Sequence, residues 1–251
     1  MDNTRVVLVT GASSGIGKAA AISFAQQGDI VVLADINEAL GNEVLQEIKA
    51  AGGKALFIKT NVADWEAMEE MHQQIVKQYG RLDVAVNNAG ISNLPTSLVD
   101  TSNKDWETVM SVNATSVFYG MKLQVAQMLK QGGGVIVNTA SVAGLRGLPK
   151  SVAYTASKHA VVGITKTAAM EYAKKNIRIN AICPVFTVTA LFQPEMMNQI
   201  SEGLSEKLKK TIPMRRFGDV QETADTILWL CSDKASFING IALPIDGGMT
   251  A

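Results

Sequence analysis

The chain has 251 residues, of which 47% are hydrophobic and 18% charged, and its 23 basic residues balance its 23 acidic residues. That balance argues against a nucleic-acid surface, and no apolar stretch has the length of a membrane span. With two cysteines and two histidines, no metal site is expected. The opening residues lead directly into an apolar run, so we expect no signal peptide and a cytoplasmic protein.

Short apolar runs alternate with helix-like segments along the chain. Strands are predicted at residues 5–10, 30–35, 54–62, 84–90, 135–141, 177–183 and 241–246. Helices are predicted at about 18–28, 37–50, 64–79, 102–112, 113–130, 154–175 and 220–231, with one more helix-like stretch inside 184–217. This alternation predicts an α/β fold: a Rossmann-type, doubly wound, parallel seven-stranded sheet with helices on both faces, in a single domain over residues 1–251.

The first predicted strand ends in a glycine turn that holds Gly11, Gly15 and Gly17. Such glycines let backbone N–H groups approach a pyrophosphate at a helix N-terminus. A tight strand-to-helix connection would explain the glycines alone. The flanking apolar strands, and an acid at the end of the second strand, Asp35, favour a dinucleotide site. Asp35 would accept hydrogen bonds from the adenosine ribose, and it is also a candidate N-cap of the helix that follows.

A second group of residues runs from Ser141 through Tyr154 to Lys158. If Tyr154 opens a helix, Lys158 lies one turn along on the same face. An ammonium beside a phenol lowers the pKa of the phenol, which then exchanges a proton with a substrate oxygen near neutral pH. Ser141 is a candidate to hydrogen-bond the same oxygen. The Tyr-x-x-x-Lys pair alone is weak evidence, because many amphipathic helices carry it by chance.

Together these motifs resemble the short-chain dehydrogenase/reductase family over essentially the whole chain. The resemblance rests on residues 10–17 (TGASSGIG), 87–90 (NNAG), Asn113, Ser141 with Tyr154 and Lys158, and 246–248 (DGG). It implies a catalytic set of Asn113, Ser141, Tyr154 and Lys158. In that set Tyr154 exchanges the proton, Ser141 orients the substrate oxygen, and Lys158 lowers the tyrosine pKa and binds the nicotinamide ribose. Asn113, at a kinked point of its helix, would hold a water that relays protons.

The resemblance also implies the contacts to the cofactor. They are expected from Gly11, Ser13, Ser14, Gly15, Ile16, Gly17, Asp35, Ile36, Asn61, Val62, Asn87, Ala89, Gly90, Tyr154, Lys158, Pro184, Val185, Thr187 and Thr189. Two positions depart from the usual family pattern. Val185 follows Pro184 where glycine is usual, and a side chain there is expected to reshape the loop. Asn61 stands in place of an aspartate, and its amide is expected to serve beside Val62.

Asp35 also bears on which nicotinamide is bound. Its carboxylate suits free ribose hydroxyls and repels a 2′-phosphate. Members that prefer the phosphate usually place Arg or Lys where this chain has Ser14, Ile36 and Asn37. We therefore expect NAD(H) to be preferred over NADP(H).

The segment 186–217 is expected to be a lid over the cleft. Its apolar residues favour an apolar alcohol or ketone as the substrate, although several recur at helical spacing and such a stripe usually packs on the core. The leading hypothesis is an NAD-dependent alcohol dehydrogenase or ketone reductase. A 3-oxoacyl-thioester reductase is the alternative, disfavoured because that activity commonly uses NADPH. A non-catalytic NAD-binding sensor or scaffold would not need all four proton-transfer residues. The resemblance also implies a homo-oligomer, commonly a tetramer.

Overall fold

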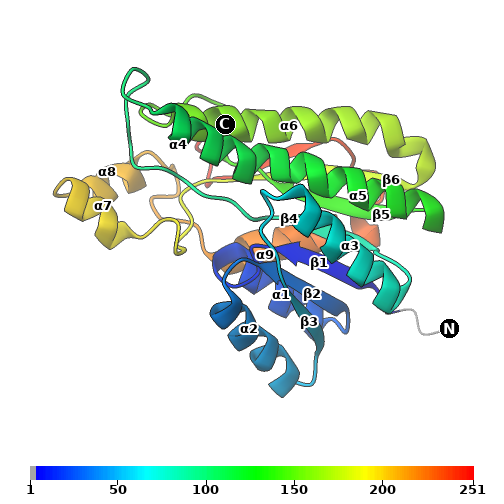
Figure 1. Cartoon of the computed structure of the whole chain (residues 1–251). Coiled ribbons are helices and arrows are strands. Elements are labelled where there is room, and N and C mark those ends of the chain that lie inside the picture. Colours follow the sequence, from blue (N-terminus) through cyan, green and yellow to red (C-terminus); the bar gives the residue numbers. More distant parts are fainter. Residues whose placement is uncertain (1–3) are drawn as a thin grey trace.

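The computed structural model describes residues 4–251, whose strands form a seven-stranded parallel sheet (Figure 1). The strands are β1 (Val6–Thr10), β2 (Ile30–Asp35), β3 (Lys54–Lys59), β4 (Val84–Asn87), β5 (Gly134–Thr139), β6 (Ile177–Pro184) and β7 (Ala242–Ile245). Their spatial order is β3-β2-β1-β4-β5-β6-β7, which confirms the predicted α/β fold. Successive strands are added on one side of β1 up to β3 and on its other side from β4 onward, so the strand order reverses between β1 and β4. In such sheets ligands bind at the carboxyl ends of the strands beside the reversal.

Helices cover both faces of the sheet (Figure 1). One face carries α1 (Gly15–Gln26), α2 (Glu38–Ala50) and α9 (Val220–Leu230), and the other carries α3 (Trp65–Tyr79), α4 (Asn103–Met110), α5 (Ser116–Gln131) and α6 (Val152–Tyr172). Side chains alternate along a strand, so β1 contributes to two buried clusters. Val7 and Val9 pack in the cluster that includes α1 and α9, and Leu8 packs in the one that includes α3 and α5. Burial on both faces explains why β1 is a continuous apolar run.

Capping residues set several helix ends. The Asp64 side chain accepts a hydrogen bond of 3.0 Å from the Ala67 N–H at the start of α3, and Gly80, with φ 73°, ends that helix. Helix α2 is capped by Asn37, whose side chain accepts from the Leu40 N–H. The prediction of Asp35 as the N-cap is therefore wrong. Strands β3 and β5 end before the predicted Val62 and Ser141 because the chain leaves the sheet there to form cavity walls.

Two helical segments differ from the prediction. The helices predicted at 102–112 and 113–130 are joined by a π-helical turn, Ser111–Thr115, and such an insertion bends a helix. The segment 186–217 holds two short helices instead of one, α7 (Pro194–Ile200) and α8 (Leu204–Lys210). They are separate because Ser201 has extended backbone and Gly203 takes a φ of 70°.

The edge strands of the sheet are β3 and β7. Lys54 and Lys59 stand at the two ends of β3, and β7 contains Pro244. Within residues 4–251, no helix is both long and apolar enough to cross a membrane. The same residues contain no group of three or more His, Cys, Asp or Glu placed to hold a metal ion.

Candidate active site

A cavity of about 620 Å³ opens at the carboxyl ends of the central strands. Every residue predicted for catalysis or cofactor binding lines it except Gly17, Asn87 and Asn113. We call one part the Asp35 end, formed by Gly11 and residues 13–16, 35–36 and 60–62. The other part is the lid end, formed by Val142, Arg146, Leu148, Phe186, Leu191, Phe192, Leu208 and Thr211. The two parts follow strands on opposite sides of the β1–β4 reversal, apart from Leu208 and Thr211.

The glycine turn at the Asp35 end brings main chain to the cavity surface. Gly11 and Gly15 take left-handed φ values of 65° and 53°, which glycine adopts readily. Gly17 does not line the cavity; a Cβ there would lie 2.1 Å from the Gly11 carbonyl oxygen, so its role is close packing of α1 on the turn. The Asn88 amide donates to the carbonyl oxygens of Thr10 (3.1 Å) and Gly11 (3.3 Å) and ties the turn to β4.

Asp35 is held in place by main-chain donors. Its Oδ2 accepts a hydrogen bond of 3.0 Å from the Ser13 N–H, and its Oδ1 accepts one of 2.9 Å from the Asn37 N–H. These contacts fix a carboxylate in the cavity wall beside the start of α1, where the helix dipole favours an anion such as a pyrophosphate. A dinucleotide therefore fits the donors and acceptors at this end.

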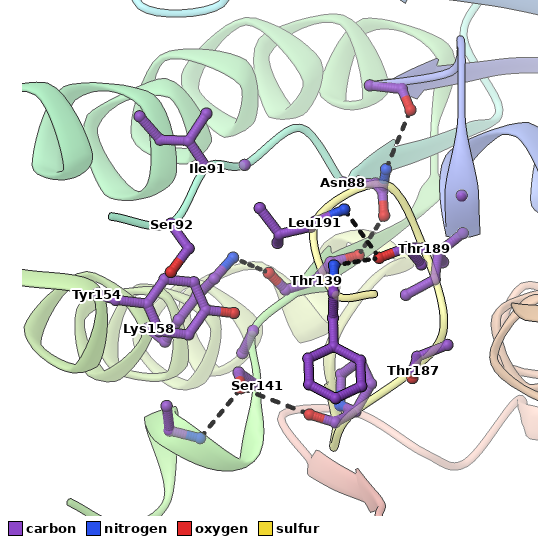
Figure 2. Close-up of a pocket in the computed structure, with 18 of the residues that line it drawn as sticks. Asn88, Ile91, Ser92, Thr139, Ser141, Tyr154, Lys158, Thr187, Thr189 and Leu191 are labelled. Carbon is purple, nitrogen blue, oxygen red and sulfur yellow. Dashed lines mark hydrogen bonds between the residues drawn. The ribbon is translucent and has the colours of Figure 1, made fainter. Parts of the chain in front are cut away.

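The structure brings Ser141, Tyr154 and Lys158 together on one wall (Figure 2). Helix α6 begins at Val152, so Tyr154 lies in its first turn and Lys158 one turn later. The Lys158 Nζ atom lies 5.7 Å from the centroid of the Tyr154 ring and donates a hydrogen bond of 2.9 Å to the Thr139 carbonyl oxygen. The Ser141 hydroxyl accepts from the Ala143 N–H at 3.1 Å and faces the cavity.

The protonation of this pair differs from the sequence prediction. Burial raises the pKa of Tyr154 above its ordinary value, and the hydrogen bond with Ser141 lowers it by less. Burial also lowers the pKa of Lys158 to about 8. The expected fall in the tyrosine pKa is therefore wrong, because desolvation of the phenolate outweighs the groups that favour it. At neutral pH the site holds a protonated phenol beside a buried ammonium.

Asn113 lies in the π-helical turn, at the predicted kink, and is fully buried. Its carboxamide Oδ1 accepts from the Ile91 N–H at 2.8 Å, and its Nδ2 donates to the Ile91 carbonyl oxygen at 2.9 Å. A Cβ built on Gly90 would lie 3.3 Å from Asn113 Oδ1 and 3.4 Å from Lys158 Nζ. The observed role of Asn113 is thus to hold the chain at Ile91 behind the cavity wall, close to Lys158.

Asn87 does not line the cavity, and its predicted contact with the cofactor stays a prediction. Its amide exchanges hydrogen bonds with Gln124, of 3.0 and 2.8 Å, and donates to Asn138 at 2.8 Å. The alternation of side chains along β4 points Asn87 toward α5 instead. The following residues, 88–90, do line the cavity.

The two departures from the family pattern are accommodated. Among residues 4–251 the non-glycine residues with positive φ are Lys150, Asn176 and Arg215, so Val185 keeps an ordinary backbone. Its N–H donates to the Ile245 carbonyl oxygen at 3.1 Å. The loop is therefore not forced into a conformation that only glycine favours. The side chain of Asn61 accepts from the Ala63 N–H at 3.2 Å, and both Asn61 and Val62 line the cavity.

Some cavity residues were not predicted from the sequence. Ile91 and Ser92 follow the NNAG motif directly, and Figure 2 draws Ser92 on the same side of the cavity as Tyr154. Residues 142–148 follow Ser141, so nearness in sequence to a predicted residue was the available signal in both cases. Thr60, Val112 and Met249 also line the cavity and adjoin Asn61, Asn113 and the DGG motif, while Leu208 and Thr211 belong to the predicted lid segment.

Comparison with known proteins gives one consistent family. The family model described as "Enoyl-(Acyl carrier protein) reductase" matches residues 11–250. Cyclohexanol dehydrogenase of Acinetobacter sp. (strain SE19) is 43% identical over 249 residues, which cover 99% of this chain and 96% of that protein. The chain belongs to the short-chain dehydrogenase/reductase family.

Further members of the short-chain dehydrogenase/reductase family share the full length of this chain. The 3-oxoacyl-[acyl-carrier-protein] reductase of Thermotoga maritima is 41% identical over 249 residues, or 98% of this chain and 97% of that protein. The crystal structure of NAD⁺-bound xylitol dehydrogenase superposes with a TM-score of 0.93 at 32% identity, covering 99% of this chain and 100% of that one. This chain is thus an oxidoreductase of a family that binds nicotinamide cofactors.

Proposed function

We propose that this short-chain dehydrogenase/reductase transfers a hydride between NAD(H) and an apolar secondary alcohol or ketone. The observation that carries the proposal is the convergence of Ser141, Tyr154 and Lys158 on one wall of a cavity that has a carboxylate at one end and mostly apolar side chains at the other. Residues 1–251 would act as a single catalytic domain, with the segment 186–217 as its lid.

Tyr154 is the proposed general acid and base. Because burial raises its pKa, the phenol is protonated at neutral pH, the form that donates a proton to a carbonyl oxygen. Alcohol oxidation needs the phenolate, so we expect the oxidation rate to rise with pH. Ser141 would donate to the same substrate oxygen, and the Lys158 ammonium would stabilise the phenolate and bind the nicotinamide ribose. A water held at Asn113 would relay the proton toward solvent.

The proposed cofactor site uses the residues that line the cavity from the glycine turn to β6. The pyrophosphate would lie over residues 11–16, the adenosine ribose at Asp35, and the adenine beside Asn61 and Val62. The nicotinamide would lie against the residues that follow β6, including Thr187 and Thr189. When bound, the nicotinamide supplies or accepts the hydride.

The preference for NAD(H) is proposed from Asp35. A 2′-phosphate would meet a carboxylate that two main-chain N–H groups hold in position, and such like-charge contacts are costly. We expect kcat/KM with NADH to exceed that with NADPH by about 100-fold, and Asp35→Ser to remove most of this difference. A native chain that works better with NADPH would overturn the assignment.

A 3-oxoacyl-thioester reductase is the alternative. It is favoured by the likeness to the Thermotoga maritima reductase and disfavoured by Asp35, for the reason given above. A non-catalytic NAD-binding scaffold is a third candidate, against which the complete proton-transfer set argues.

The experiment that tests these candidates measures absorbance at the nicotinamide band. Cyclic and linear ketones, their alcohols, an acetoacetyl thioester and an enoyl thioester are each tested with NAD(H) and NADP(H). Turnover of ketones or alcohols with NAD(H) supports the proposal, and faster turnover of the acetoacetyl thioester supports the alternative. Absence of turnover on the whole panel, with NADH binding intact by calorimetry, would contradict the proposal and favour the scaffold.

We also propose a homo-oligomer, commonly a tetramer in this family. Large apolar side chains are exposed on the surface, including Phe118 and Trp229, and Phe237 is fully exposed. Burial of such side chains favours association. Light scattering would give four chain masses, and a single-chain mass would contradict the proposal.

A further inference from the structure

The segment 186–217 leaves and rejoins the protein at one narrow neck. The Gly218 N–H donates to the Phe186 carbonyl oxygen at 3.0 Å, and the Val188 N–H donates to the Gly218 carbonyl oxygen at 3.3 Å. The two chain ends of the segment are therefore adjacent, and helices α7 and α8 lie between them in sequence. This neck is one of the contacts that hold the segment in place, beside the hydrogen bond of 3.2 Å from the Met214 N–H to the Gly247 carbonyl oxygen.

Three aromatic rings pack together at the neck. The ring centroids of Phe186 and Phe192 are 5.1 Å apart, those of Phe192 and Phe217 are 5.1 Å apart, and those of Phe186 and Phe217 are 6.4 Å apart. Phe217 meets both partners edge-on, with interplanar angles of 80° and 73°, which is a favourable geometry for aromatic pairs. Lys209 of α8 places its Nζ 5.6 Å from the Phe217 centroid and so joins the helix to the cluster.

The three rings differ in their access to the cavity. Phe186 and Phe192 line its lid end, whereas Phe217 does not. Phe192 is also anchored through its main chain, because its N–H donates to the Thr189 hydroxyl at 3.3 Å. Phe217 thus supports, from outside the cavity, two rings that a substrate would touch.

We propose that Phe217 is a positioning residue that fixes Phe186 and Phe192 as a rigid aromatic wall for the substrate. This rests on the proposed function of the same cavity. A rigid pair of ring faces offers a flat apolar surface, which a cyclic ketone or alcohol covers with little loss of conformational freedom. A short linear ketone covers less of it and gains less from the wall. The wall therefore selects ring-bearing substrates.

Phe217→Leu tests the proposal, since leucine keeps an apolar side chain and removes the ring edges. We expect KM for cyclohexanone to rise about tenfold, with kcat within about twofold of the native value and KM for butanone nearly unchanged. The dissociation constant of NADH, measured by calorimetry, stays the same. Phe217→Tyr restores the native KM because it keeps the ring. Phe57→Leu is the matched control, since it makes the same change in β3 at a side chain that does not line the cavity.

Hydrogen exchange gives a second measurement that needs no turnover. In Phe217→Leu the amides of Val188 and Gly218, which close the neck, exchange faster, while amides of β1 do not change. Unchanged exchange at the neck, or equal rises in KM for cyclic and linear ketones, would overturn the proposal. Failure of the proposed function is distinguishable, because the native chain would then turn over no ketone while the exchange result is still readable.

Discussion

The two ends of the cavity are built from different parts of the polypeptide. At the Asp35 end the surface includes the main chain of the glycine turn, which is shaped by left-handed Gly11 and Gly15 and held by hydrogen bonds to Asp35 and from Asn88. At the lid end the surface consists of side chains from separate segments, among them Val142, Arg146 and Leu148 after β5 and Leu208 of α8. Where the main chain forms the surface, its conformation restricts which residues the sequence can have there. Where side chains form the surface, each substitution changes the shape of the surface. The first end therefore tolerates few changes, and the second accepts many.

The largest expected effect belongs to Tyr154, which lies between the two ends. Tyr154→Phe removes the proton donor but keeps the ring, so we expect kcat/KM to fall about 1,000-fold. NADH affinity by calorimetry should stay within about twofold of the native value, because neither end is disturbed. A kcat/KM of Tyr154→Phe that remains within about tenfold of the native value would contradict the assignment of Tyr154 as the general acid and base.

The main-chain character of the Asp35 end is tested by Gly17→Ala. The new Cβ would lie 2.1 Å from the Gly11 carbonyl oxygen, so the turn must move. Overpacking of this kind costs about 1–3 kcal/mol, and we expect NADH affinity to fall about tenfold or more. Gly163→Ala in α6 is the control, since a Cβ there meets nothing within 4 Å. Native NADH affinity in folded Gly17→Ala would contradict this account.

Substitution of Lys158 tests whether this active-site residue lowers the free energy of unfolding of the native protein. Burial lowers its pKa from 10.5 to about 8, so at pH 7 the folded protein holds an ammonium that favours water. Lys158→Met should lower kcat/KM, by less than Tyr154→Phe does, yet raise the free energy of unfolding at pH 7 by about 2 kcal/mol.

The difference in unfolding free energy between Lys158→Met and the native protein should also depend on pH. Between about pH 8 and 10.5 the unfolded native chain holds a proton on Lys158 that the folded chain has lost, so the native protein gains stability as the pH rises. Urea titrations should therefore show the advantage of Lys158→Met shrinking from pH 7 to pH 10. An advantage that is constant with pH would mean that the buried charge is not its cause.

The smallest effect is expected at the lid end. Leu148 lines the cavity and is 38% exposed, so Leu148→Ala removes one apolar contact without opening the core. KM for a cyclic ketone should change by about threefold to fivefold, and NADH affinity and unfolding free energy should stay nearly the same. A large fall in NADH affinity would show that the two ends are not independent.

This difference explains what the sequence could predict. The glycine turn, Asp35 and the group from Ser141 to Lys158 belong to strands, turns and helices whose geometry demands particular residues, so their spacing indicated both fold and chemistry. The orientation of Asn87 was missed because a motif does not say on which face of a strand a residue points. The tyrosine pKa was missed because desolvation depends on all surrounding atoms. Leu208 and Phe217 belong to the predicted lid segment, but their individual contacts could not be predicted, since these depend on the packing of distant segments.

The two edge strands have a consequence for behaviour at high protein concentration. The carbonyl oxygens of Ile241 and Ile245 accept hydrogen bonds from Ala181 of β6 and from Val185, which follows β6. The alternate residue Pro244 therefore faces the open side of β7. An added strand would need the N–H that proline lacks. At the other edge, Lys54 and Lys59 place charges at both ends of β3. Neither edge offers a ready template for sheet extension, so folded molecules should resist edge-to-edge aggregation.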